Sequence, residues 1–117
     1  MDKKLVKSLK ALADPTRLKI IRILSHRENM CVCEIQHVLG ITQPTASNQL
    51  KILENVGIVE YVRDGSWVNY SLKNFKNNLK LDRLVRAASA WMDSTEELKE
   101  LIELVRNVDR NEITQKN

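Results

Sequence analysis

The sequence predicts a mainly α-helical domain with one β-hairpin, in the order α-α-α-α-β-β-α-α. Apolar residues recur at helical spacing through both ends of the chain, whereas they alternate with polar residues between positions 58 and 72, as in β-strands. Asp64-Gly65 separates two alternating runs, and this dipeptide is the strongest short signal for a hairpin. With 117 residues, 43% of them hydrophobic and 29% charged, the chain is expected to be one globular domain with at most an appended helix.

Two helices are predicted before residue 26. Leucines at positions 5, 9 and 12 share one face of a helix over residues 3–13, away from its lysines. Asp14-Pro15 ends this helix and begins the next, because proline fits the first turn, where its missing N–H costs nothing. The second helix is expected to run to about Ser25, with a polar connector over residues 26–29.

A third helix over residues 31–39 and a fourth over residues 43–56 are joined by the short corner Gly40-Ile41-Thr42. Thr42 is a good N-cap, and Pro44 fits the first turn of the fourth helix. Two helices joined by a short turn that contains glycine are typical of the helix-turn-helix motif. A hairpin directly after the second of them makes the predicted fold a winged helix-turn-helix with a two-stranded β-wing.

Two more helices are predicted after the hairpin. The first covers residues 78–92 and carries an apolar stripe formed by Leu81, Leu84, Val85, Ala88, Trp91 and Met92. The second covers residues 94–108 and begins with a capping box, in which Ser94 is followed by Glu97 three residues later. Residues 111–117 are expected to form a frayed polar end.

Several short pieces of sequence occur together and in a consistent order: Ala13-Asp14-Pro15-Thr16-Arg17-Leu18, Leu39-Gly40-Ile41, Gln43-Pro44-Thr45-Ala46-Ser47, Leu50-Lys51-Ile52-Leu53, Gly57-Ile58-Val59 and Arg63-x-Gly65. Through them the chain resembles the arsenical-resistance repressor (ArsR/SmtB) family of winged-helix regulators, over about residues 3–92. The resemblance implies a homodimeric repressor that binds an inverted-repeat operator in double-stranded DNA and releases it on sensing an effector.

The fourth predicted helix carries the candidate DNA-binding side chains. Its apolar residues form an inner stripe, and the polar residues that point elsewhere are Gln43, Thr45, Ser47, Asn48 and Lys51. Asn and Gln can bond bidentately to adenine, Ser and Thr can contact base edges or phosphate, and Lys can contact phosphate or guanine. An ordinary solvated face explains the spacing equally well; the corner, the wing and the resemblance favour DNA contact. Arg63 on the wing is the candidate for a phosphate or minor-groove contact.

Cys31 and Cys33 are the candidate metal ligands. Relatives in the family that sense arsenite, antimonite, cadmium or lead carry thiolates on this helix, so the resemblance implies a soft metal or metalloid effector, with zinc as a borderline ion. Residues two apart on an ideal helix point roughly 200° apart. One ion would therefore reach both sulfurs only if the first helical turn bent, which gives a route from ion binding to DNA release. The alternative is that both are small buried residues.

The rest of such a site is incomplete in the sequence. The arsenite-sensing pattern has a third cysteine where this chain has Gln36; His37, the partner subunit or a small thiol could supply a further ligand. The helix over residues 78–92 holds Asp82 but no histidine, so the family's interfacial zinc site is not expected there. A disulfide between alternate residues of a regular helix would be strained, so we rank a thiol-redox trigger below metal binding. A winged-helix regulator with no metal effector is the remaining alternative.

The apolar stripe of the helix over residues 78–92, together with the apolar face of residues 5–13, exceeds what one small winged domain needs. These residues could complete the monomer core, but a palindromic operator requires two copies of the DNA-binding helix, which favours a homodimer. No phosphate-cradling glycine loop, nucleophile elbow or paired-histidine motif occurs in the sequence. We therefore expect neither an enzyme nor an organic cofactor.

Charge divides the chain into two parts. Residues 1–92 hold 15 Lys and Arg against 8 Asp and Glu, a net +7, whereas residues 93–117 hold 4 against 7, a net −3, which together give the overall +4. We interpret residues 1–92 as the DNA-binding and dimerisation domain and residues 93–117 as an acidic C-terminal helix with a frayed tail. The sequence shows no secretory signal and no membrane span, so we expect a cytoplasmic protein with reduced thiols and no membrane partner.

Overall fold

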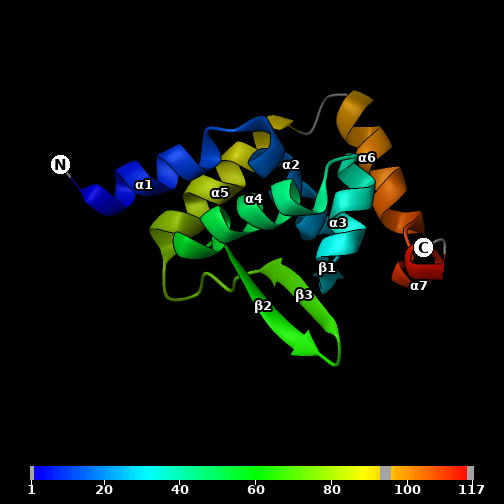
Figure 1. The fold of residues 1–117 in the computed structure, drawn as a ribbon. Coiled ribbons are helices and arrows are strands. Elements are labelled where there is room, and N and C mark those ends of the chain that lie inside the picture. Colours follow the sequence, from blue (N-terminus) through cyan, green and yellow to red (C-terminus); the bar gives the residue numbers. More distant parts are fainter. Residues whose placement is uncertain (1, 93–95, 116–117) are drawn as a thin grey trace.

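The computed structural model describes residues 2–92 and 96–115. Its helices are α1 (Lys3–Leu12), α2 (Pro15–His26), α3 (Val32–Leu39), α4 (Gln43–Asn55), α5 (Leu79–Met92), α6 (Glu96–Asn107) and α7 (Arg110–Gln115), and its strands are β1 (Met30–Cys31), β2 (Val59–Asp64) and β3 (Trp67–Leu72). Figure 1 shows the β2–β3 hairpin projecting away from the helices, with α1 beside α5 at one end and α6 and α7 at the other. No helix in this described part is long and apolar enough to cross a membrane.

Local signals set the helix boundaries as predicted. The Asp14 carboxylate accepts a hydrogen bond from the Arg17 amide (3.0 Å), and the Thr42 hydroxyl accepts one from the Thr45 amide (3.3 Å), so both residues cap a helix. Gly40 ends α3 in the left-handed conformation (φ 66°), which glycine adopts without strain. The helix-turn-helix of α3 and α4 and the hairpin after it are therefore confirmed.

The hydrophobic core is centred on α2. Four of its side chains are fully buried and pack with residues from α3, α4 and the C-terminal helices; this cluster includes Ile20, Ile21, Ile23, Leu24, Ile35, Leu50, Leu53, Leu98, Leu101 and Val105. The acidic helix α6 therefore packs through its apolar face against the same core as the helix-turn-helix motif. This packing fixes α6 beside α2 and α3.

The sheet has three strands, where two were predicted. Met30 and Cys31 pair antiparallel with Tyr70 and Asn69, so the strand order is β1-β3-β2. Asn29, whose φ is 56°, turns the chain from α2 into this short strand. The sequence did not reveal β1 because two residues are too few to display an alternating pattern.

The end of the chain also differs from expectation. Residues 110–115 form α7, although the sequence predicted a frayed polar end from Asn111 onwards. The reason is tertiary: Ile113 packs against the core, and the Arg110 guanidinium is held by side chains of α3 and β3. The predicted capping box of α6 begins at Ser94, which lies outside the described residues.

Candidate nucleic-acid interface and cysteine pair

The polar face of α4, which we define as Gln43, Thr45, Ser47, Asn48 and Lys51, points away from the core. Four of these side chains are exposed and Ser47 is half-buried, whereas Ala46, Leu50 and Leu53 on the opposite side are buried. The Gln43 amide donates to the Ser47 hydroxyl (2.9 Å), so the two groups are mutually oriented. The structure thus brings the five predicted residues together on one accessible helix surface.

Arg17 anchors α4 from the opposite side. Its guanidinium donates to the Gln49 side-chain oxygen (2.7 Å) and to the backbone carbonyls of Ala11 (2.6 Å) and Lys10 (3.0 Å). One planar fork therefore joins α1, α2 and α4, which fixes the orientation of α4 relative to the N-terminal helices. Arg17 belongs to a motif recognised in the sequence, but its partners lie too far along the chain to be predicted.

Arg63 lies on β2, exposed near the tip of the wing and apart from the polar face of α4. Midway along the hairpin, the rings of the paired residues Tyr61 and Tyr70 are 5.7 Å apart between centroids. Burial raises the pKa of Tyr70, and the Glu54 carboxylate and Tyr61 raise it further, so this phenol stays neutral at physiological pH. The contact between these two rings joins the two strands of the wing.

Cys31 and Cys33 are joined in a disulfide, which differs from the reduced thiols that we expected. Cys31 is not part of the helix: it is the last residue of β1 and the N-cap of α3, with extended backbone (φ −74°, ψ 162°). The expectation that the two side chains point to opposite sides of a helix is therefore wrong. Their Cα atoms are 5.4 Å apart, within the usual range for a disulfide.

The same backbone decides how well the pair fits a soft metal or metalloid ion. The two sulfurs lie on one side of the chain, so in the reduced form both could contact one ion, whereas the disulfide offers no thiolate. Gln36 is a poor ligand for soft ions, and His37 is exposed on α3. The described residues form no group of three or more His, Cys, Asp or Glu side chains able to hold a metal. The chain thus fits a soft ion with two donors.

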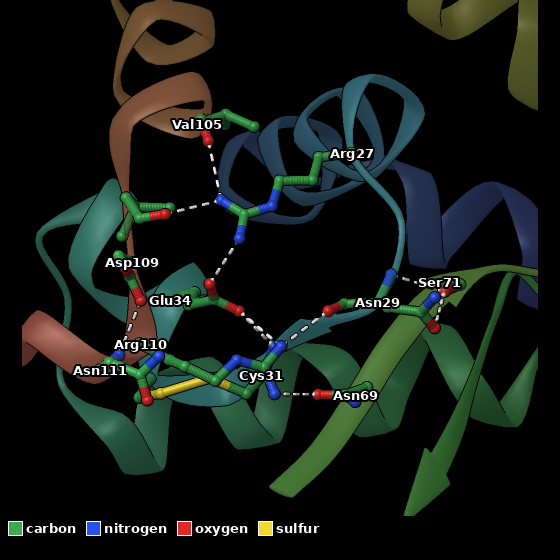
Figure 2. Close-up of polar contacts among 12 residues, drawn as sticks. Arg27, Asn29, Cys31, Glu34, Asn69, Ser71, Val105, Asp109, Arg110 and Asn111 are labelled. Atoms are coloured by element: carbon green, nitrogen blue, oxygen red, sulfur yellow. Dashed lines mark hydrogen bonds and ion pairs between the residues drawn. A yellow bond between two sulfur atoms is a disulfide. The ribbon is translucent and has the colours of Figure 1, made fainter. Parts of the chain in front are cut away.

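A buried carboxylate lies directly beside the cysteine pair. Glu34 is 0% exposed, and its oxygens accept hydrogen bonds from the Cys31 amide (3.0 Å), Arg27 (2.8 Å) and Arg110 (3.0 Å). Figure 2 shows Glu34 between the two guanidinium groups, which come from the end of α2 and the start of α7. We call Glu34, Arg27 and Arg110 the Glu34 cluster. Charge pairing makes the burial of this carboxylate tolerable.

Both arginines of the Glu34 cluster also bind other elements. Arg27 donates to the carbonyls of Val105 (3.0 Å) and Val108 (2.8 Å) at the end of α6. Arg110 donates to the Asn69 side chain on β3 (2.8 Å) and lies 5.0 Å from the centroid of the Trp67 ring. The Trp67 ring therefore lies against the Arg110 guanidinium at the start of α7.

The Glu34 cluster was not predicted from the sequence. Glu34 follows Cys31 by three positions, and an acidic residue at that place is the second half of a capping box, which is the one signal that could have found it. Its pairing with Arg110 spans 76 positions, and no local pattern carries that information.

The predicted dimerisation stripe divides into two parts. Leu81 and Val85 are buried in the monomer core, which agrees with the alternative that the stripe completes this core. Trp91, in contrast, is 89% exposed. Leu5 and Leu9 on the neighbouring helix α1 are also exposed. Large apolar side chains therefore remain exposed on both helices.

Comparison with known proteins gives a consistent result. Residues 14–61 match the family model described as "Bacterial regulatory protein, arsR family". A cadmium resistance transcriptional regulatory protein CadC homolog from Staphylococcus aureus is 42% identical over 66 residues, which are 56% of this chain and 54% of that protein. The chain thus spans about half the length of the curated relatives that it matches.

Solved structures agree over a larger part of the chain. The transcriptional repressor BigR from Xylella fastidiosa is 34% identical with a TM-score of 0.62, over 75% of this chain and 82% of that one. A homodimeric winged helix-turn-helix DNA-binding domain from Mycobacterium bovis, titled a possible ArsR-family transcriptional regulator, is 28% identical with a TM-score of 0.65, over 77% and 79% of the two chains. Both are winged-helix regulators, and neither comparison points to an enzyme.

Proposed function

Because the chain belongs to the arsR family of bacterial regulatory proteins, we propose that it is a homodimeric transcriptional repressor whose DNA affinity is controlled by Cys31 and Cys33. The observation that carries this proposal is the position of the two sulfurs at the start of α3, the helix that packs against α4. A chemical change at the pair acts on the element that supports the DNA-binding helix.

DNA binding is supported by the polar face of α4 and by charge. In helix-turn-helix proteins the second helix enters the major groove and its N-terminal residues contact the base edges. Gln43 and Asn48 are the residues on this face that can read adenine, and Lys51 can neutralise a phosphate. Arg63 on the wing would contact the adjacent backbone or the minor groove. The net charge of +7 over residues 1–92 favours a polyanionic partner.

A homodimer is supported by the exposed apolar side chains of α1 and α5. Trp91, Leu5 and Leu9 would be covered by a second copy of the same surface, as a two-fold interface requires. The similar domain from Mycobacterium bovis is titled homodimeric. Two copies would present two α4 helices to the half-sites of an inverted repeat in double-stranded DNA.

For the trigger, we propose that arsenite, antimonite or a thiophilic divalent ion such as cadmium, lead or zinc binds the reduced pair. Two thiolates are the donors that soft ions select, and the relative from Staphylococcus aureus is named for cadmium resistance. The partner subunit or a small thiol would supply a further ligand. Bound ion would hold Cys31 and Cys33 in a fixed geometry at the N-terminus of α3 and so lower the affinity for the operator.

The disulfide favours a second candidate, thiol-redox sensing at the same residues. Its formation removes two electrons and two protons from the thiols, and a disulfide or peroxide oxidant accepts them. The two candidates exclude each other at one moment, because a thiolate that ligates an ion is not available for the S–S bond.

One experiment separates them. An operator is selected from a random duplex library with the reduced protein, and its binding is followed by fluorescence anisotropy. The reduced complex is then titrated with each of the five ions, or with hydrogen peroxide, which accepts the two electrons and two protons of the thiols. Release by an ion alone supports metal sensing, and release by the oxidant alone supports redox sensing.

The control uses Cys31→Ser and Cys33→Ser, which are expected to bind the operator as the reduced wild type does but to lose the release. If either variant still releases DNA with every ion and with oxidant, the assignment of the sensor to this pair is wrong. If the wild type selects no operator, the repressor function itself is wrong.

A further inference from the structure

We propose that Arg110 is a positioning residue that makes the placement of the wing depend on the chemical state of Cys31 and Cys33. This inference rests on the proposed function for its biological role, since the wing is there taken to contact DNA. Its physical basis is the set of contacts that joins the Glu34 cluster to Cys31 and to strand β3. None of the three residues belongs to the polar face of α4.

The first step links the cysteine pair to Glu34. The carboxylate oxygen Oε1 accepts hydrogen bonds from both the Cys31 amide (3.0 Å) and the Arg110 guanidinium (3.0 Å). Glu34 is fully buried, so water cannot replace either donor. A change in the backbone of Cys31 therefore alters the position of the oxygen that holds Arg110.

The second step links Arg110 to the wing. The same guanidinium donates to the Asn69 side-chain oxygen (2.8 Å) and to the Asn29 carbonyl (2.9 Å), and lies over the Trp67 ring. Asn69 and Trp67 belong to β3, the central strand of the sheet. Asn69 is also the backbone partner of Cys31, so the cysteine pair and Arg110 converge on one residue of the wing (Figure 2).

The third step concerns what the disulfide does. The S–S bond closes a very small ring over residues 31–33 and restrains the extended backbone of Cys31. A dithiol reductant breaks this bond: two electrons and two protons pass to the cysteines, and the reductant becomes a disulfide. Cys31 then regains conformational freedom, and the contact between its amide and Glu34 is no longer enforced.

A purely structural role for Arg110 makes a different prediction. If Arg110 only attaches α7 to the rest of the molecule, its loss lowers stability by the same amount in both redox states. If Arg110 transmits the redox state of the cysteines, its loss makes the surroundings of Trp67 the same in the oxidised and the reduced protein.

The test is fluorine NMR of the full chain labelled with 5-fluorotryptophan. The sequence has two tryptophans, and Trp91→Phe assigns the two resonances. We expect the Trp67 resonance of the wild type to shift between oxidised and dithiothreitol-reduced protein. Arg110→Gln is expected to abolish that shift. The matched control is Arg106→Gln, which removes the same charge from an exposed position on α6 and should leave the shift intact.

An unchanged Trp67 resonance on reduction of the wild type overturns the inference, as does an equal shift in Arg110→Gln. Should Arg110→Gln fail to fold, Arg110→Lys decides. A lysine keeps the positive charge beside Glu34, but as a point charge it cannot hold Glu34, Asn69 and Trp67 together. The shift should therefore also be lost in Arg110→Lys, and its persistence overturns the inference.

Operator binding distinguishes this inference from the proposed function. In Arg110→Gln the ratio of operator Kd values between the two redox states should move towards one by roughly 2- to 30-fold. A wild-type Kd that is indifferent to redox state, with a Trp67 resonance that still shifts, overturns the redox trigger and supports the coupling through Arg110.

Discussion

The polar face of α4 and the Glu34 cluster lie on the two sides of the same helix-turn-helix motif and are built from opposite kinds of contact. The position of the polar face depends only on features of α4 itself, namely its Thr42 cap and the buried stripe of the same helix. The Glu34 cluster joins α2, α3 and α7, and its carboxylate is completely removed from water. One region is therefore free to meet a ligand, and the other directs its charged groups at partners within the chain.

This difference implies a division of roles. Substitutions on the polar face of α4 should change DNA affinity and leave folding intact, whereas substitutions in the Glu34 cluster should change stability and the response to cysteine chemistry. Exposed polar residues contribute little to stability, but removal of one member of a buried charge cluster leaves the others without compensation. Each prediction below challenges this division.

The largest effect is expected for Glu34→Ala. This change leaves two arginines partly buried without their carboxylate and removes the acceptor of the Cys31 amide. It should lower the free energy of unfolding by about 3 kcal/mol, the lower end of the range for a broken buried ion pair. The lower end applies because both arginines retain some solvent contact. Urea denaturation in a fixed redox state measures this loss of stability. The control is Glu100→Ala, which removes an exposed glutamate from α6. A loss no greater than that of Glu100→Ala would mean that the cluster is energetically neutral.

An intermediate effect is expected for Asn48→Ala. Loss of a bidentate contact to a base should weaken operator binding by about 5- to 150-fold, and should weaken binding to random duplex much less. Asn55 offers a matched control, since it is the same residue type on the same face two turns further along α4. Equal losses on operator and random DNA would leave only phosphate contact for Asn48. The urea midpoint should be unchanged.

The smallest effect is expected for Arg63→Gln on the wing. If Arg63 neutralises a phosphate, its loss weakens operator and random duplex alike and reduces the slope of log K against log salt by about one. Anisotropy titrations at several salt concentrations measure this slope, and Arg106→Gln controls for net charge. A slope that stays at the wild-type value would remove Arg63 from the DNA interface.

The two regions also differ in how far the sequence predicted them. Thr42, Gly40 and Asp64-Gly65 act through bonds to residues a few positions away, so their patterns located α4 and the wing correctly. The structure confirmed that the five polar residues of α4 share one surface, and their contact with DNA stays a prediction. Helical periodicity also placed α5 and most of α6.

What escaped prediction depends on distant partners. Met30 and Cys31 form a strand only because β3 offers them a free edge, and this placement takes Cys31 out of α3 and allows the disulfide. Residues 110–115 are helical because Arg110 and Ile113 find partners in the folded domain. Short polar segments of this kind carry too little local preference to reveal their structure.

The 76 positions that separate Arg110 from Glu34 have a consequence for synthesis. A protein is synthesised from its N-terminus, so α2, α3 and α4 leave the ribosome well before residue 110 is added. Until then Glu34 has only Arg27 to neutralise it, and Asn69 lacks its guanidinium partner. The nascent protein can therefore form its helix-turn-helix motif early, but the connection between the cysteines and the wing is completed only after α7 has been synthesised.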